Sequence, residues 1–174
     1  MAPLNIRNAI SDDARAIAAI QVAASRAAYA DIVLPDYLKG LTVPARTAVW
    51  AQLIAAANEP ERIMVGEEAD CVRGYAHFGR SRDLDATERT GELYSLYVNP
   101  VSWRRGMGRQ LLAASLRGLG DFGFNSATLW VLAANSQGRR FYERCGWHND
   151  RTDKGPDTSL MVIRYRCQLS ALAC

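Results

Sequence analysis

The run from Ala127 to Leu132 is short, continuous and apolar, and a segment with helical character lies on each side of it. A strand of this kind is expected where both of its faces are buried. The segment before it, Gly106 to Leu119, places apolar residues at helical spacing. The segment after it, Asn135 to Cys145, is followed by Gly146, a residue suited to a helix C-terminus. The sequence therefore predicts a sheet that contains a buried strand, with a helix before this strand and a helix after it in the chain.

The other segments add an antiparallel part to this sheet. Strands are predicted at residues 4–8, 62–67, 72–80, 92–98 and 159–168, and helices at residues 11–29 and 44–57. The order is one strand, two helices, three strands, and then helix, strand, helix and strand. Because this order mixes neighbouring strands with βα crossovers, it predicts an α+β fold with a mixed sheet. A length of 174 residues suits a single domain over residues 1–174.

Composition argues against several classes of function. No apolar run approaches the roughly 20 residues that span a bilayer, and Met1 to Ile10 lacks the apolar part of a signal peptide, so we expect a cytoplasmic protein without a membrane partner. The net charge of +3 is too small to indicate a nucleic acid partner. The four cysteines form no CxxC pair and there are only two histidines, so no metal site is expected.

A loop with two glycines connects the strand at 92–98 to the next helix. The N–H groups at a helix N-terminus bind phosphate, and Gly106 and Gly108 allow the backbone to approach it closely. The positive charges around this loop are Arg104, Arg105 and Arg109. The alternative is an ordinary helix start with turn glycines and solvated arginines, because the spacing matches neither a Walker A loop nor a dinucleotide-binding loop.

This loop and a second segment together resemble two motifs of the GNAT superfamily of N-acetyltransferases. The stretch Trp103-Arg104-Arg105-Gly106-Met107-Gly108 resembles the pyrophosphate loop (Q/R)-x-x-G-x-(G/A), with Trp103 in place of the leading Gln or Arg. The stretch NSQGRRFYERCGW, from Asn135 to Trp147, resembles the motif N-x-x-(A/G)-x-x-F-Y-x-x-x-G-(F/W). The resemblance implies a bacterial member with the acyl-CoA N-acyltransferase fold. In that fold, a mostly antiparallel sheet is flanked by about four helices, and the strands at 92–98 and 127–132 splay apart.

The resemblance also implies a site for acetyl-CoA, which is a co-substrate in this family, and it implies no metal. The main chain of the strand at 92–98 would pair with the pantetheine arm like an added strand, and the Val98 N–H would face the thioester carbonyl. The residues implied in coenzyme binding are Leu96, Tyr97, Val98, Trp103, Arg104, Arg105, Gly106, Met107, Gly108, Arg109, Asn135, Gly138, Arg139 and Tyr142.

Acetylation of an amine requires loss of a proton from the amine, a donor for the developing oxyanion and a proton for the leaving thiolate. The resemblance places Tyr142 beside the sulfur, and a phenol with a pKa near ~10 can protonate a thiolate whose thiol has a pKa near ~8.5. The alternative is that Tyr142 only packs its helix against the sheet. Glu92 precedes Gly106 by the spacing of the general base in histone-modifying members, so it is the candidate base. Its alternative is a strand-end carboxylate in solvent.

The sequence does not identify the acceptor amine. Tyr29 and Tyr94 are candidate acceptor-site residues, with packing as their alternative role. The first hypothesis is an N-acetyltransferase for a small-molecule amine that acts by direct attack in a ternary complex. The second is a peptide or protein acetyltransferase for an N-terminus or lysine, and the third is a non-catalytic acyl-CoA-binding module. Tyr142 and Glu92 weigh against the third, and the possibility of a homodimer stays open.

Overall fold

The computed structural model describes residues 4–155 and 160–169. Its strands are β1 (Leu4–Asn8), β2 (Arg62–Glu68), β3 (Cys71–Arg80), β4 (Thr90–Val98), β5 (Ser126–Leu132), β6 (His148–Lys154) and β7 (Met161–Gln168). Its helices are α1 (Ala14–Tyr29), α2 (Pro35–Gly40), α3 (Val43–Ala56), α4 (Met107–Asp121) and α5 (Ser136–Arg144), with short 3-10 turns at Ser11–Asp13 and Pro100–Ser102. All of the predicted elements are present, although Ser159, the predicted start of the last strand, lies outside the described residues.

The strands form one sheet in the order β1-β2-β3-β4-β5-β7-β6. Every neighbouring pair is antiparallel except β4 and β5, which are parallel because α4 crosses over between them. The predicted α+β fold with a mostly antiparallel sheet is therefore confirmed. Five helices rather than about four are found among the described residues.

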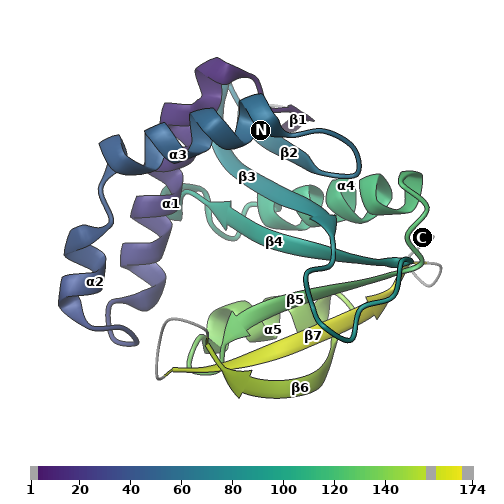
Figure 1. The fold of residues 1–174 in the computed structure, drawn as a ribbon. Helices are drawn as coiled ribbons and strands as arrows, with labels where there is room; N and C mark the ends of the chain where they lie inside the picture. Colours follow the sequence, from purple (N-terminus) through teal and green to yellow (C-terminus); the bar gives the residue numbers. More distant parts are fainter. Residues whose placement is uncertain (1–3, 156–159, 170–174) are drawn as a thin grey trace.

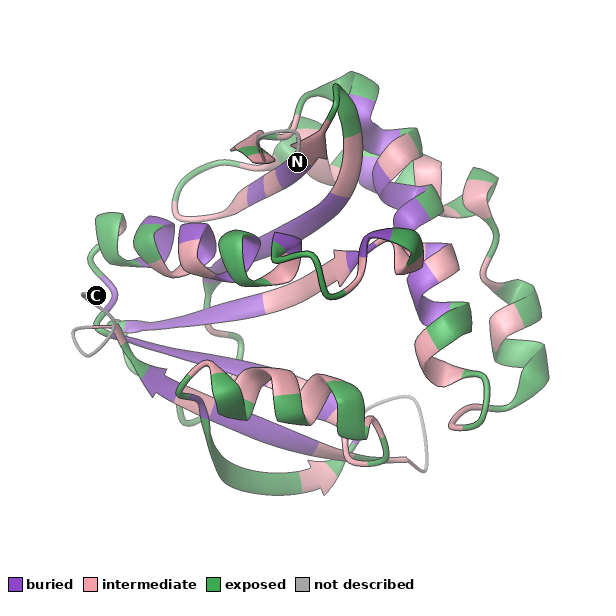
Figure 2. Ribbon diagram, turned by 180° about the vertical axis from the view of Figure 1, so that it is seen from behind, coloured by how far each residue is buried: buried purple, intermediate pink, exposed green. Residues whose placement is uncertain are grey.

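Helices cover both faces of this sheet (Figure 1). Helix α1 packs against β3 and β4 and also against α3, whereas α4 crosses β2, β3 and β4. Seen from behind, α4 and α5 lie on the same side of the sheet, with α4 over the first half and α5 over β5 and β7 (Figure 2). The buried sides of these elements face the sheet, as expected for amphipathic helices.

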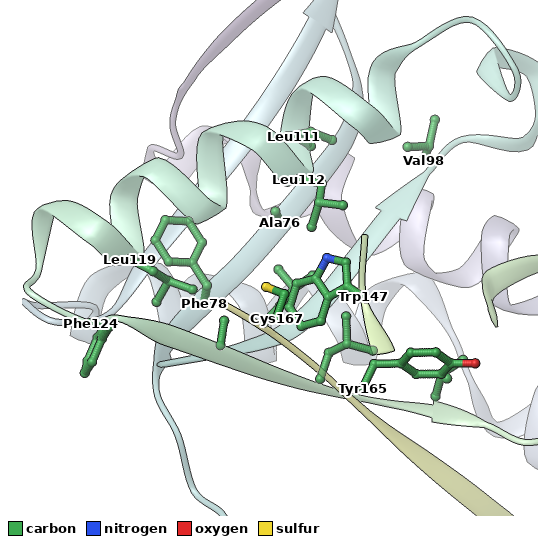
Figure 3. Close-up of a cluster of buried hydrophobic side chains, with 14 of the residues drawn as sticks. Ala76, Phe78, Val98, Leu111, Leu112, Leu119, Phe124, Trp147, Tyr165 and Cys167 are labelled. Carbon is green, nitrogen blue, oxygen red and sulfur yellow. The ribbon is translucent and has the colours of Figure 1, made fainter. Parts of the chain in front are cut away.

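Each face of the sheet has its own hydrophobic cluster. On the α4 side, buried side chains from α4, β3, β5 and β7 surround Trp147 (Figure 3). On the α1 side, Ile17, Trp50, Val65 and Tyr75 form the centre of the second cluster. Burial of each large apolar side chain contributes about 1.5–3 kcal/mol. The two clusters therefore hold β4 between two packed layers and fix its position relative to β5.

The ladder between β4 and β5 is short. Residues Thr90–Glu92 pair with residues Ser126–Thr128, and no pairing follows beyond that point in the described strands. A bulge in the β3–β4 ladder adds Tyr94 as an extra residue between the pairs of Leu93 and Ser95. A bulge bends the strand that carries it, so the second half of β4 turns away from β5. This confirms the predicted splay.

Two elements were not predicted. Helix α2 is a short, mostly exposed helix with Pro35 in its first turn, and its polar sequence lacks a long apolar stripe. Strand β6 is almost entirely exposed and pairs only with β7, at the edge of the sheet. Charged side chains are common on edge strands because they prevent pairing with other chains.

Candidate active site

A cleft with a volume of about 850 Å³ lies where β4 and β5 separate. The second half of β4 and residues 129–132 of β5 form its two sides. The start of α4, helix α5, Tyr29 of α1 and Val162 of β7 also contribute to the lining. Clefts of this size hold small ligands and cofactors.

Main-chain groups of β4 point into the cleft. The Asn99 N–H donates to Arg73 O at 2.7 Å, toward β3. Successive N–H groups of a strand point in opposite directions, so the N–H and C=O of Val98 point away from β3, as do those of Leu96. The Val98 oxygen accepts a hydrogen bond of 2.7 Å from Trp103 Nε1. The other three groups face the splay and are available to an extended ligand.

The loop before α4 combines two unusual backbone conformations. Arg104 has φ of +60° and Gly106 has φ of +91°, and a non-glycine residue in the left-handed region is often found at a functional site. The first bond inside α4 runs from Gln110 N–H to Gly106 O at 3.1 Å. The three amides before Gln110 therefore have no acceptor inside the helix. With Arg104 and Arg109 lining the cleft, this end suits a phosphate group.

Three side chains implied in coenzyme binding do not line the cleft. Arg105 forms an ion pair with Glu68 at 2.8 Å, and the Met107 side chain is buried in the core beneath α4. Arg139 donates to Tyr165 Oη and to Ala133 O, both at 3.2 Å. These contacts occupy the three side chains in the structure, and their implied role in coenzyme binding stays a prediction.

Asn135 caps helix α5. Its Oδ1 accepts a hydrogen bond of 2.9 Å from the Gly138 N–H, as the side chain of a helix N-cap does. A Cβ at position 138 would lie 2.7 Å from the Asn135 amide nitrogen, so a larger residue there would require the Asn135 side chain to shift. Both residues line the cleft.

Tyr142 lies at the C-terminal end of α5 and lines the cleft. Its ring packs edge-on against Trp147, with 6.0 Å between centroids, and against Phe141, with 5.1 Å. No described residue forms a hydrogen bond with its hydroxyl in the structure. Burial, with a further contribution from Tyr97, raises the pKa of Tyr142 well above its ordinary value. The phenol therefore keeps its proton and can donate it in the cleft.

Two further tyrosines reach the cleft from the opposite side. The hydroxyl groups of Tyr29 and Tyr97 lie 3.4 Å apart, and the Tyr97 ring stacks on Tyr75 with 5.7 Å between centroids. Burial raises the pKa of Tyr29 far above its ordinary value. Sequence reasoning assigned Tyr97 through its main chain only. Because side chains alternate along β4, its ring could have been placed on the other face of the strand from the side chains of Leu96 and Val98.

Glu92 is neither free nor in solvent. It is 3% exposed, and its carboxylate accepts hydrogen bonds from Arg82 N at 2.8 Å and from Arg82 Nη2 at 2.7 Å. The Tyr94 ring lies 4.2 Å from the same guanidinium, and its hydroxyl donates to Arg80 O at 2.7 Å. Glu92 is absent from the lining of the cleft, and it borders an adjoining hollow of about 460 Å³. Its role as a base stays a prediction, and its contacts favour an ion-pair role.

Residues 4–155 and 160–169 contain no group of three or more His, Cys, Asp or Glu side chains placed to hold a metal ion. Within the same residues, no helix has the length and apolar character needed to cross a membrane.

Comparison with known proteins gives the family to which this fold and cleft belong. The family model described as "Acetyltransferase (GNAT) family" matches residues 26–147, well over half of the chain. The chain therefore belongs to the GNAT family of acetyltransferases, as its two motifs indicated.

Several relatives agree with this assignment. The chain is similar to the uncharacterized N-acetyltransferase YuaI of Bacillus subtilis, with 31% identity over 133 residues, 76% of this chain and 73% of that protein. It is also similar to the L-amino acid N-acyltransferase MnaT of Escherichia coli, with 30% identity over 98 residues, 56% of this chain and 55% of that protein. Its fold matches yncA of Salmonella typhimurium, solved with its cofactor acetyl-CoA. That match has a TM-score of 0.70 and 22% identity, and covers 98% of this chain and 96% of that chain.

Proposed function

We propose that this chain transfers the acetyl group of acetyl-CoA to the primary amine of a small molecule. The observation that carries the proposal is the cleft at the splay. It has unpaired helix amides at one end, open main-chain groups of β4 along its side and the Tyr142 hydroxyl in its lining.

These features fit the parts of acetyl-CoA. The amides that open α4, together with Arg104 and Arg109, offer donors and positive charge to the diphosphate. Leu96 offers its main-chain N–H and C=O to the pantetheine arm, and Val98 offers its N–H one strand repeat further on, to the thioester carbonyl. The thioester would then lie near Tyr142, the residue that the resemblance places beside the sulfur.

The reaction is a direct attack in a ternary complex. The neutral amine attacks the thioester carbonyl, and the Val98 N–H donates to the oxygen that gains negative charge. When the C–S bond breaks, Tyr142 gives its proton to the thiolate. The new amide nitrogen loses one proton to solvent, and Tyr142 takes one proton back from solvent, so that no net proton is released. The products are the acetamide and free coenzyme A.

A covalent acetyl-enzyme is not part of this scheme. Cys145 lines the cleft, but burial raises the pKa of its thiol, against a smaller opposing effect of Arg109. A cysteine nucleophile needs a lowered pKa. Incubation with acetyl-CoA alone is therefore expected to leave the protein unacetylated in intact mass spectra.

A small acceptor is supported by the size of the adjoining hollow, about 460 Å³, and by the similarity to MnaT, which is named as an amino acid N-acyltransferase. The matched region spans only part of that relative, so its substrate is a guide rather than an assignment. A peptide or protein acceptor is the alternative, and the acceptor screen below includes it.

The test begins with binding of acetyl-CoA, measured by titration calorimetry, followed by release of free thiol in the presence of amines and peptides. Tyr142→Phe is expected to lower kcat by about 100-fold, since general acid catalysis contributes about 10²–10⁴, and to leave the Kd for acetyl-CoA nearly unchanged. Tyr37→Phe, at an exposed position on α2, is the matched control. Absence of measurable affinity for coenzyme A or its acyl forms would overturn the proposal. Unchanged turnover in Tyr142→Phe would show that Tyr142 is not the general acid.

A further inference from the structure

The hollow adjoins the cleft, and Tyr94, Trp130 and Val162 line both spaces. Arg82 and Lys154 border the hollow and not the cleft. A molecule whose amine reaches the splay would therefore extend its other end toward these two cations.

The carboxylates that border the hollow already have partners. Asp83 accepts from Trp130 Nε1 at 2.8 Å and from Arg164 Nη1 at 3.2 Å. Glu92 is paired with Arg82, and Asp153 accepts from Arg151 at 2.8 Å. A second ammonium group on the acceptor would compete with these bonds, so the hollow does not favour a diamine.

The two cations still have hydrogen-bond donors without a partner in the described part of the chain. Within the described part of the chain, Lys154 Nζ makes no ion pair, and Arg82 Nη1 makes no hydrogen bond, since Arg82 contacts Glu92 through its other two nitrogens. The Arg82 side chain is 67% exposed. Both groups can therefore bind an anion without breaking an existing contact.

The wall that carries Arg82 is fixed in place. Arg164, which is 4% exposed, donates to Asp83 and Asp85 in the loop after β3, at 3.2 Å and 2.6 Å, and to Asp150 in β6 at 2.9 Å. These bonds tie that loop to β6 and β7. Because the loop is held at both Asp83 and Asp85, the position of Arg82 over the Tyr94 ring is set before any ligand binds.

We propose that this hollow binds the carboxylate of an acceptor that carries both an amine and a carboxylate, as a free amino acid does. The carboxylate is held by Arg82 and Lys154, the α-carbon lies between Tyr94 and Trp130, and the amine points into the splay. This inference rests on the proposed acetyl transfer and adds the class of acceptor.

The first experiment compares acceptors that share a side chain and carry a carboxylate, a neutral amide or no group beside the amine, with rates expressed per unprotonated amine. Phenylalanine, phenylalaninamide and phenethylamine form one matched set, and leucine, leucinamide and isopentylamine form another. The kcat/KM of the amino acid is expected to exceed those of the amide and the amine by at least about tenfold, the range that hydrogen bonds to charged groups supply.

The second experiment changes the cation. Lys154→Ala is expected to raise KM for the amino acid by about tenfold, to leave kcat within about twofold and to leave the amide unaffected, whereas Lys154→Arg keeps the preference. Lys39→Ala, which removes the only other lysine, at an exposed site on α2, is the control. The Kd for acetyl-CoA is measured for every variant and is expected to stay constant.

The outcomes separate the two proposals. If the wild type binds acetyl-CoA and acetylates the uncharged-tail amines as well as the amino acids, acetyl transfer stands and the carboxylate site is wrong. If Lys154→Ala lowers activity equally for all acceptors, the selectivity argument is also wrong. If acetyl-CoA binds but no acceptor in either set reacts, the amino acid class is overturned. If acetyl-CoA does not bind, the transferase proposal itself fails.

Discussion

Trp103 Nε1 donates a hydrogen bond of 2.7 Å to the main-chain oxygen of Val98, and this bond ties the loop before α4 to the last residue of β4. Trp103 stands where the family motif has Gln or Arg. Its indole thus takes a structural role: it saturates the Val98 oxygen and leaves the Val98 N–H as the open group at that point of the strand.

Trp103→Phe removes this donor and keeps most of the ring. We expect a loss of about 1 kcal/mol in the free energy of unfolding, the usual value of one hydrogen bond, and weaker binding of acetyl-CoA because the end of β4 is less well fixed. Urea unfolding and titration calorimetry measure the two effects. Equal stability and affinity in the variant would show that the bond has no positioning role.

The raised pKa of Tyr142 predicts the shape of the pH profile. Burial disfavours the charged phenolate, so the proton-donating form persists above the ordinary phenol pKa of ~10. With saturating acetyl-CoA, kcat/KM is expected to rise with pH as the acceptor amine loses its proton. No descending limb is expected at pH values below ~10. A descending limb below pH ~9 that disappears in Tyr142→Phe would show that Tyr142 is the acid but that its pKa is not raised.

Glu92→Gln tests whether Glu92 is a base or a partner for Arg82. The variant keeps the size of the side chain and removes its charge, so the bonds from Arg82 weaken. We expect a loss of about 1–2 kcal/mol in stability, because hydrogen bonds to charged groups are lost while Arg82 stays solvated. The pH dependence of kcat/KM is expected to keep its shape. If the variant instead loses the ascending limb and most of its activity, Glu92 is the base.

Asp85 links stability to acid pH. The bond from Arg164 lowers the pKa of Asp85 from 3.8 to about 2. A carboxylate with a lowered folded-state pKa stabilises the fold above its unfolded pKa and loses that contribution as pH falls from about 4 to about 2. Because the Asp85 side chain is 48% exposed, we expect Asp85→Asn to cost only about 0.5–1 kcal/mol at pH ~7.

The effect of the same variant is expected to be much smaller at pH ~2, because the folded-state pKa of Asp85 is about 2 and most of the stabilising contribution of its charge is lost there. Thermal unfolding at the two pH values gives the comparison. A cost that is independent of pH would mean that Asp85 acts through packing or loop geometry and not through its charge.

Arg164→Met, which leaves three carboxylates around a neutral side chain, is expected to lower the free energy of unfolding by about 3–5 kcal/mol.

The fold could be predicted from the sequence where periodicity was strong. The buried strand at 127–132 and the helices around it follow from apolar spacing, and the two motifs led to the splay. Strand β6 could not be found in this way, because it is exposed at the sheet edge and has no apolar alternation. Helix α2 is too short for a periodic signal and is held by its first-turn proline and its neighbours.

The candidate site was predicted best where main chain and glycines define it. Sequence spacing placed the amides of α4, Asn135 and Tyr142 correctly on their elements. It could not show that Arg105 turns to Glu68 or that Arg82 covers Glu92, because both ion pairs join segments that lie far apart in the chain or across a loop. Long-range pairing of charged side chains has no local pattern, so it appears only when the fold is known.

The short ladder between Thr90–Glu92 and Ser126–Thr128 also means that β4 and β5 are joined by strand pairing at one end only. Strands β1 to β4 with α1 to α4 form one half of the molecule, and β5 to β7 with α5 form the other. A ligand that hydrogen-bonds to β4 and also contacts α5 would connect the two halves where β4 and β5 do not pair. Bound acetyl-CoA should therefore slow hydrogen exchange in β5 as well as in β4, since ligand binding to the folded state stabilises the structure that it joins.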